Sequence, residues 1–235
     1  MQDSRVAELS VFFPAYNEEA NVRSTSERIL RVLSEVSNRY ELLIVDDGSV
    51  DQTGTIADEL SAGDPNVRVI HHATNRGYGG ALRTGFYNCR YDLIAFIDGD
   101  GQFDFSEIPE FLNASQEHDL VIGYRVRRRD SLMRTINARA WGALIRVVFG
   151  LGVRDVDCAF KLIRKSVLGR IPRLRSDGAM ISAELLVRCR NAGLSFQEVP
   201  VHHFPRHGGD QTGADLRVIV KAFRDLFGLW RVIRQ

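Results

Sequence analysis

The chain has 235 residues and a net charge of +1, with 44% hydrophobic and 26% charged residues. These values are typical of one globular domain, or one domain with a small extension, and the near-neutral charge argues against nucleic acid as a partner. The three cysteines lack the spacing of zinc sites or disulfide frameworks, so we expect reduced thiols in a cytoplasmic protein. The N-terminus does not resemble a signal peptide, and no uncharged run approaches the roughly 18 residues that span a bilayer.

Strand and helix patterns alternate from the N-terminus to Tyr124. Strands that alternate with helices of ten or more residues predict an α/β fold with a mostly parallel central sheet flanked by helices. The predicted strands are Leu9–Phe13, Glu41–Val45, Val67–His71, Leu93–Ile97 and Asp119–Tyr124. The predicted helices are Glu19–Val36, Asp51–Leu60, a segment that ends near Cys89, and Ser106–Glu117, which Ser106 caps.

The run Leu93–Ile97 reads as a strand buried on both faces, and it ends in Asp98-Gly-Asp100-Gly-Gln102. In extended backbone Asp98 and Asp100 point the same way. Together with Gln102 they offer hard oxygen donors of the kind that suit Mg²⁺ or Mn²⁺ beside a substrate phosphate. Asp-Gly pairs are also common turn formers, so this motif alone leaves both interpretations open.

Three polar loops follow predicted strands. These are the Pro14–Glu18 loop, the segment Asp46–Ser49 and the segment Asp98–Gln102. In parallel α/β sheets ligands bind at the carboxyl ends of the strands, so we expect the three loops to share one edge. Their convergence favours a metal–phosphate site over a set of unrelated turns.

Two common nucleotide motifs do not fit. The stretch Gly77–Gly80 imitates a dinucleotide fingerprint, but Leu82 stands where a third small residue belongs. The stretch also follows the third predicted strand, whereas the fingerprint normally follows the first. A Walker loop is absent from the sequence. Neither hydride transfer nor P-loop hydrolysis is therefore expected.

The three polar loops belong to the stretches Pro14–Glu19, Val45–Asp51 and Asp98–Gln102. Taken together, these stretches resemble motifs of family 2 glycosyltransferases. The resemblance is greatest to the polyprenyl-phosphate sugar synthases of the dolichyl-phosphate mannose (or glucose) synthase type, and it covers nearly the whole chain. It continues through Asn75–Gly77, Gly123–Arg125, Asp155–Leu162 and Glu198–Val201.

The resemblance implies a GT-A fold and a metal-dependent, inverting glycosyltransferase. The sugar would pass from a nucleotide-sugar donor, of the GDP-mannose or UDP-glucose type, to a polyprenyl or dolichyl phosphate. By the same resemblance, the nucleotide would contact Pro14, Tyr16, Glu18, Asp46 and Asp47, and the cation would contact Asp98, Asp100 and Gln102.

Some of these residues also have simpler interpretations. Glu18 could favour a helix N-terminus, and Ser49 and Asp51 could be turn and cap residues. For Asp46 and Asp47 we favour a ligand role, because two adjacent carboxylates at the end of a buried strand are costly without partners.

An acceptor phosphate needs positively charged side chains to position it. A phosphate is already anionic at neutral pH, so it requires cationic positioning more than a general base. Arg125 and Arg134 match arginines of the family pattern, and Arg206 could join them from a later loop. Arg127 to Arg129 are expected to be solvated.

Asp157 departs from the family pattern, which usually has Thr at this position. It could act as a base or contact a sugar hydroxyl, or it could pair with Lys161 or Arg164. We do not expect metal ligation by His202, His203 and His207, since the first two are adjacent and face apart in a strand.

The last segment differs from the predicted catalytic domain, 1–213. Residues 214–235 predict an amphipathic helix with a narrow basic stripe and a broad apolar face, and 131–151 predict a second one. Such a helix suits the interface of a membrane, here its cytoplasmic face, with packing on the sheet or on a second subunit as the alternative.

Two other functions stay open at this stage. One is a soluble transferase that acts on a small hydroxyl or phosphate acceptor, and the other is a nucleotide-binding module without turnover. The intact pair Asp98 and Asp100 argues against the second.

Overall fold

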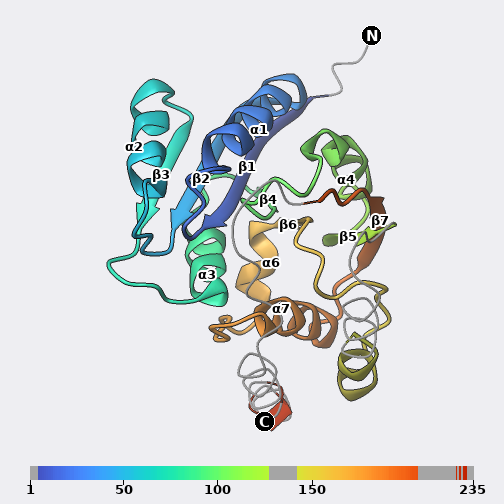
Figure 1. Ribbon diagram of the computed structural model, residues 1–235. Helices are drawn as coiled ribbons and strands as arrows, with labels where there is room; N and C mark the ends of the chain where they lie inside the picture. The colour runs from blue at the N-terminus through green and yellow to red at the C-terminus, as the bar shows by residue number, and fades with distance from the viewer. Residues whose placement is uncertain (1–4, 127–141, 206–225, 227, 229, 232–235) are drawn as a thin grey trace.

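The computed structural model describes residues 5–126, 142–205, 226, 228, 230 and 231. Its centre is a seven-stranded sheet in the order β3-β2-β1-β4-β6-β5-β7 (Figure 1). Of the six strand pairings in the described residues, four are parallel and two, on either side of β6, are antiparallel. The strands are β1 (Val6–Ala15), β2 (Ser37–Asp46), β3 (Val67–His71), β4 (Leu93–Phe96), β5 (Leu120–Arg125), β6 (Lys161–Arg164) and β7 (Phe196–Val201).

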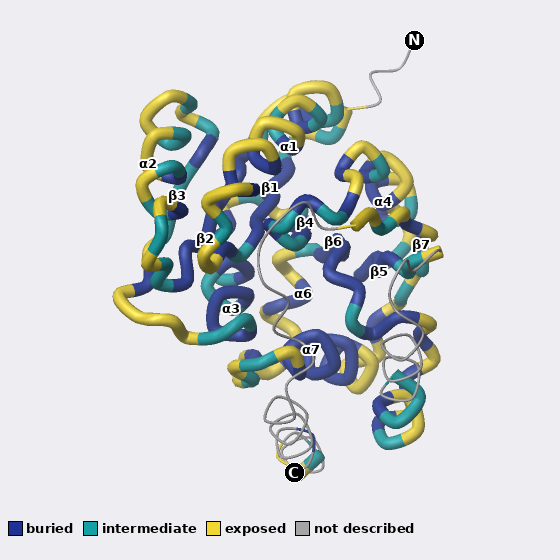
Figure 2. The backbone as a smooth tube through the Cα atoms, in the orientation of Figure 1, coloured by how far each residue is buried: buried dark blue, intermediate teal, exposed yellow. Residues whose placement is uncertain are grey.

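Helices flank the sheet, as the alternating pattern predicts. The helical spacing of Val22, Ile29 and Leu33 places these three side chains on one buried face of the first helix. Figure 2 shows the strands as mostly buried and the outer turns of the helices as exposed. The helices are α1 (Val22–Val36), α2 (Thr53–Gly63), α3 (Tyr78–Asn88), η1 (Phe105–Glu107), α4 (Ile108–Ala114), α6 (Lys165–Arg170) and α7 (Met180–Asn191), and residues 142–149 are also helical.

The α/β prediction is therefore confirmed, and the differences lie at element ends and in the second half. The predicted capping role of Ser106 is wrong: Asp104 is the N-cap, and its carboxylate accepts a hydrogen bond from the Ser106 backbone N–H at 2.9 Å. The helix that follows ends at Ala114 rather than near Glu117. The antiparallel strand β6, between β4 and β5, was not predicted.

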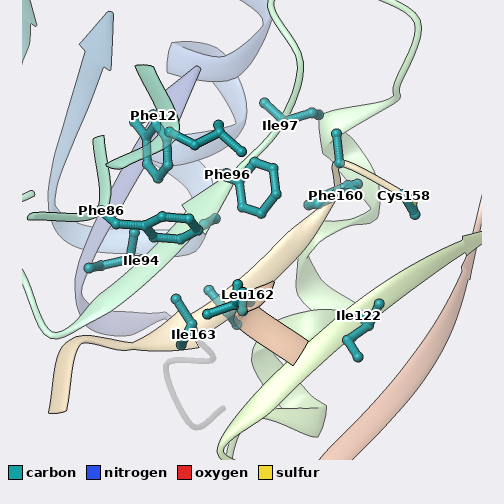
Figure 3. Packing of buried hydrophobic residues seen from close by; sticks show 14 of the residues in the cluster. Phe12, Phe86, Ile94, Phe96, Ile97, Ile122, Cys158, Phe160, Leu162 and Ile163 are labelled. Carbon is teal, nitrogen blue, oxygen red and sulfur yellow. The ribbon is translucent and has the colours of Figure 1, made fainter. Parts of the chain in front are cut away.

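Aromatic side chains fill the space between β1, β4 and α3. The Phe12 ring lies 5.0 Å from the Phe86 ring and 5.7 Å from the Phe96 ring, measured between centroids (Figure 3). Gly85 permits this packing, because a Cβ atom there would lie 2.0 Å from Phe12 Cδ2. The backbone of α3 therefore rests directly on the sheet, and Tyr78 at its first position reaches the carboxyl edge of the strands.

The predicted amphipathic segments lie mostly outside the described residues. Within 214–235 only 226, 228, 230 and 231 are described, and they are helical. Of the second segment, 142–149 are helical. In the part of the chain that the structure describes, no helix is both long and apolar enough to cross a membrane.

Candidate functional site

The predicted site residues gather at one edge of the sheet. The strands β1, β2, β3 and β4 are parallel, so their carboxyl ends meet there. Ala15 is in register with Asp46, and Asp46 is in register with His71. Asp98 follows β4 by two residues on the same edge. The expected convergence of the three loops is thus confirmed.

The loops after β1 and β2 are fastened to each other. The Asn17 backbone N–H donates to Ser49 Oγ at 3.1 Å, and the Val50 backbone N–H donates to Asn17 Oδ1 at 3.0 Å. The Glu18 backbone N–H donates to Thr53 Oγ1 at 2.7 Å. These bonds hold Asn17 in the left-handed region, with φ at 54°, a conformation that Asn adopts more readily than most residues. The two loops form one rigid wall of the edge.

Three residues predicted to contact the nucleotide lie on this wall. Pro14 is partly buried, and the side chain of Tyr16 is exposed. Glu18 Oε2 accepts a hydrogen bond from Asn21 Nδ2 at 2.8 Å, beside the start of α1. A helix-start role for Glu18 is thus present in the structure, and its contact with nucleotide stays a prediction.

Asp46 is buried at the end of β2 and has partners on both carboxylate oxygens. Its Oδ1 accepts from the Ser49 backbone N–H at 3.0 Å, and its Oδ2 lies 2.8 Å from His71 Nδ1. His71 Nε2 lies 3.0 Å from Asp58 Oδ1. The hydrogen bond to Asp46, opposed by partial burial and aided by Asp58, raises the pKa of His71 above its usual value.

Asp47 is held in the same manner by the next histidine. Its Oδ1 lies 2.5 Å from His72 Nδ1 and accepts from the Arg76 backbone N–H at 2.9 Å. His72 Nε2 lies 2.8 Å from Thr84 Oγ1 on α3. The argument that this acidic pair needs a ligand for want of partners is therefore wrong, because His71, the last residue of β3, and His72, which follows it, supply them.

Asp98 and Asp100 are less well compensated. Tyr78 Oη donates to Asp98 Oδ1 at 3.0 Å. Burial and the neighbouring charge of Asp100 nevertheless raise the pKa of Asp98 to about 7, against the opposing effects of Tyr78, Arg125 and Lys161. Burial and the Asp98 charge in turn raise the pKa of Tyr78 well above its usual value. Two neighbouring carboxylates of this kind are a donor set that fits a divalent cation.

Close packing fixes the backbone around these carboxylates. A Cβ atom at Gly99 would lie 2.8 Å from the Pro14 carbonyl oxygen, so only glycine permits this approach of the two loops. Thr25 Oγ1 donates to the Gly99 carbonyl at 3.2 Å. Gly101 has a φ of 72°, which glycine adopts without strain. The Asp-Gly-Asp-Gly segment is thus held between β1 and α1.

Gln102 joins this segment to a later one. Its backbone N–H donates to Asp100 Oδ1 at 3.1 Å, and its Nε2 donates to the Phe204 carbonyl at 2.8 Å. His203 packs against Phe103 with ring centroids 4.9 Å apart, and His202 Nδ1 lies 2.5 Å from Glu107 Oε1. In the described residues no group of three or more His, Cys, Asp or Glu side chains is arranged as a metal site. Cation binding by the Gln102 oxygen stays a prediction.

Arg125 is held by a bidentate ion pair. Its Nε lies 2.7 Å from Asp155 Oδ2, and its Nη2 lies 2.9 Å from Asp155 Oδ1. Burial opposes the charge, but the pair with Asp155 keeps the pKa of Arg125 above its usual value. The other two predicted phosphate-binding arginines, Arg134 and Arg206, lie outside the described residues, as does His207.

Asp157 belongs to the same cluster of charges. Its charge contributes to the raised pKa of Tyr78 and of Arg125. Of the pairing partners considered for it, Arg164 lies 3.6 Å from Asp92 Oδ2, and Lys161 Nζ donates to the Val156 carbonyl at 3.3 Å and to the Cys158 carbonyl. The role of Asp157 as a base or sugar contact stays a prediction.

Sequence reasoning missed several residues of the site. Tyr78 stands only within the rejected dinucleotide motif, and Asp155 only within a motif of the resemblance. The pair His71-His72 at the end of a predicted strand, opposite Asp46-Asp47 on the neighbouring one, is the signal that could have indicated their pairing.

Comparisons with known proteins agree with this arrangement. The model of the family "Glycosyl transferase family 2" matches residues 10–171. Among curated proteins, a dolichyl-phosphate beta-glucosyltransferase of Dictyostelium discoideum is 28% identical over 95% of this chain and 76% of that protein. An undecaprenyl-phosphate 4-deoxy-4-formamido-L-arabinose transferase of Shewanella sediminis is 29% identical over 86% and 60%. A dodecaprenyl-phosphate galacturonate synthase of Rhizobium johnstonii is 30% identical over 96% and 66%. The chain thus spans between 60% and 76% of the length of these relatives.

Solved structures show the same fold. Glucosyl-3-phosphoglycerate synthase from Mycobacterium tuberculosis, in complex with Mn²⁺ and UDP-glucose, superposes with a TM-score of 0.68 at 21% identity, covering 97% of this chain and 79% of that one. That similarity concerns the GT-A fold alone. From the family match, this chain belongs to glycosyl transferase family 2 and is a glycosyltransferase similar in sequence to the polyprenyl-phosphate sugar transferases.

Proposed function

We propose that this chain transfers a sugar from a nucleotide-sugar donor to a polyprenyl phosphate in a metal-dependent, inverting reaction. The observation that carries the proposal is the pair Asp98 and Asp100 at the edge where β1 and β2 also end, where burial and the charge of Asp100 raise the pKa of Asp98. The relatives are named for dolichyl, undecaprenyl and dodecaprenyl phosphate, which supports the class of acceptor.

The acidic pair provides the cation site in this proposal. A bound Mg²⁺ or Mn²⁺ supplies counter-charge for the departing nucleoside diphosphate. Asp98 and Asp100 hold it, with Gln102 as a neutral oxygen donor. Tyr78 fixes the orientation of Asp98 through its hydroxyl.

The wall formed by the loops after β1 and β2 receives the nucleotide. Pro14, Tyr16 and Glu18 lie on that wall, and the hydrogen bonds between the loops keep it in one conformation. Asp46 and Asp47 act there at least as positioning residues, since their bonds to Ser49 and Arg76 fix the neighbouring backbone.

Arg125 positions the acceptor. Asp155 engages Nε and Nη2 of Arg125, so the Nη1 group lies outside the bidentate pair and is suited to a phosphate oxygen. An acceptor oxygen forms the bond to the anomeric carbon while the bond to the donor diphosphate breaks, and the diphosphate leaves with the electron pair. Attack opposite the leaving group inverts the anomeric centre. Arg134 and Arg206 complete the phosphate site, and Asp157 contacts a sugar hydroxyl or serves as a base.

The acceptor is embedded in a bilayer, so the enzyme must approach one. We assign residues 214–235 as an interfacial helix on the cytoplasmic face. Its cations are worth about 1 kcal/mol each near an anionic leaflet. Deletion of 214–235 should therefore release the chain from anionic vesicles in a flotation assay, and equal flotation of both chains would favour a subunit contact instead.

A transfer assay tests the proposal. The chain is incubated with Mn²⁺, radiolabelled UDP-glucose or GDP-mannose, and undecaprenyl phosphate in detergent, and label is counted in the lipid extract. We expect lipid-linked sugar that disappears with EDTA and in Asp98→Asn and Asp100→Asn, but not in the exposed control Glu110→Gln. Label that passes only to a small water-soluble acceptor would establish the soluble-transferase alternative. Donor binding without turnover would establish the binding module.

A further inference from the structure

A groove lined by four arginines lies apart from the acidic pair Asp98 and Asp100. It has a volume of about 500 Å³ and runs between the outer face of α3 and the segment that precedes α7, and the two lie side by side in Figure 1. We call it the arginine groove; its charged and polar lining includes Arg76, Arg83, Tyr87, Asn88, Arg173 and Arg175. The first residue of α3, Tyr78, faces Asp98, whereas the groove is lined by Arg76, just before α3, and by the side of the helix that carries Gly80, Arg83 and Tyr87.

One wall of the groove is held rigidly. Arg83 Nη1 donates to the Arg175 carbonyl at 2.8 Å and to the Ser176 carbonyl at 2.5 Å, and its Nη2 lies 2.6 Å from Asp177 Oδ1. The Leu174 backbone N–H donates to Tyr87 Oη at 3.0 Å. The segment that carries Arg173 and Arg175 is thereby fixed against α3, so the guanidinium groups are brought to one side in advance of any ligand.

The remaining arginines lie over the same surface. The Arg173 guanidinium lies 4.6 Å from the centre of the Tyr87 ring. Arg76 packs on Gly80, where a Cβ atom would lie 2.7 Å from Arg76 Cβ. Arg76, Arg173 and Arg175 are exposed at the rim of the groove, so their charges face a solvent-accessible cavity.

The positive charge of the groove exceeds its negative charge. In the part of the chain that the structure describes, Asp177 is the one carboxylate that pairs with any of these four arginines, and its partner is Arg83. Four guanidinium groups against one carboxylate leave a net positive charge around a single cavity. Planar guanidinium forks present paired N–H donors that match phosphate oxygens, as they match carboxylate oxygens.

We propose that the arginine groove binds a phosphate group, at a site distinct from the transfer site. Two sources offer this chemistry: the headgroup of an anionic phospholipid, and a soluble phosphate compound. Exposure of the rim arginines makes both sources sterically accessible, and the experiment below separates them.

The test compares two double variants that remove the same charge. Arg173→Gln/Arg175→Gln removes two rim charges and leaves the Arg83 contacts to backbone carbonyls in place. Arg23→Gln/Arg31→Gln removes two exposed charges on α1 and serves as the control. Equal melting temperatures of the three proteins show that each is folded. Equal transfer to a detergent-solubilised acceptor shows that the transfer site is intact in each.

The probes are vesicles of phosphatidylcholine with phosphatidylglycerol, in a co-sedimentation assay, and inorganic pyrophosphate, in calorimetry without added divalent cation. For a headgroup ligand we expect vesicle binding to fall roughly 30-fold in the groove variant and not in the control, from about 1 kcal/mol per cation at an anionic surface. For a soluble ligand we expect pyrophosphate binding that only the groove variant loses. Equal binding of both probes by the groove variant and the control would overturn the proposal.

Discussion

Two pairs of carboxylates stand at the same edge of the sheet and differ in how their charge is balanced. Asp46 and Asp47 are buried, and each has a histidine and a backbone N–H as partners. Asp98 is buried beside a second carboxylate, and these two causes raise its pKa to about 7 against the opposing hydrogen bond from the Tyr78 hydroxyl. The first pair is hydrogen-bonded by histidines and backbone N–H groups of the protein, and the second is the pair at which we propose an external cation.

The difference teaches which acidic residues hold structure and which hold ligand. A buried carboxylate with donors on its oxygens stabilises the backbone around it, and its removal leaves those donors unsatisfied. A pair that repels itself destabilises the fold slightly and is expected where a cation belongs. The four predictions below separate these two roles, from the largest effect to the smallest.

Replacement of Asp98 or Asp100 by Asn should break catalysis without breaking the fold. We expect transfer to fall by at least roughly 100-fold, because the leaving diphosphate loses its counter-charge. The melting temperature should stay equal or rise, since one of two repelling charges is gone. Activity and differential scanning calorimetry measure the two effects, and a large fall in melting temperature would contradict the assignment.

Replacement of Asp47 by Ala should destabilise the fold. Loss of its bonds to His72 and the Arg76 N–H leaves buried donors unpaired, which we expect to lower the free energy of unfolding by about 2–3 kcal/mol. Denaturant titration measures this value. Asp92→Ala, which removes an exposed ion pair with Arg164, is the control and should change it by less than ~1 kcal/mol. Equal effects of the two variants would refute a structural role for Asp47.

Tyr78→Phe tests whether the tyrosine hydroxyl orients Asp98. It removes one hydrogen bond to a carboxylate, worth ~1.5 kcal/mol, so kcat/KM should fall about tenfold. Donor concentration series with the wild type and the variant give this ratio. Unchanged kcat/KM would mean that Asp98 needs no orientation by the hydroxyl.

His71 gives the first pair a dependence on pH. Its pKa is raised by Asp46, so its contribution to stability is present below its unfolded pKa, near 6.5, and is lost as pH rises through the higher folded value. The side chain is 42% exposed, so we expect only about 0.2–1 kcal/mol. The free energy of unfolding is measured at pH 6 and pH 9 for the wild type and for His71→Gln. Between pH 6 and pH 9 the wild type should lose this amount of stability relative to the variant. The same change with pH in both proteins would contradict the prediction.

The sequence predicted the first half of the fold better than the second. Strands β1 to β4 alternate with helices, and apolar runs that end in polar loops identify parallel strands and their shared edge. Strand β6 is short and follows a long stretch without such alternation, so its antiparallel place between β4 and β5 depends on contacts distant in sequence. Local patterns carry no information about that pairing.

The sequence indicated where the candidate site residues lie on the strands, but not which residues pair with them. Motif spacing placed Asp46, Asp98 and Arg125 at strand ends, where the structure has them. It did not reveal that His71 and Asp155 pair with two of them, because these partners come from other strands and loops. A buried charge in a sequence indicates that compensation exists, and only the fold shows whether protein or ligand supplies it.

The contact between Gly85 and Phe12 limits the substitutions that these two positions can accept during evolution. A Cβ atom at Gly85 would lie 2.0 Å from Cδ2 of the Phe12 ring, so a larger residue there requires α3 or the ring to move. Tyr78 begins that helix, and its hydroxyl lies 3.0 Å from Asp98. A larger residue at 85 is therefore compatible with the site only if the residue at 12 shrinks at the same time. Among descendants of this chain, the two positions are expected to vary together or not at all.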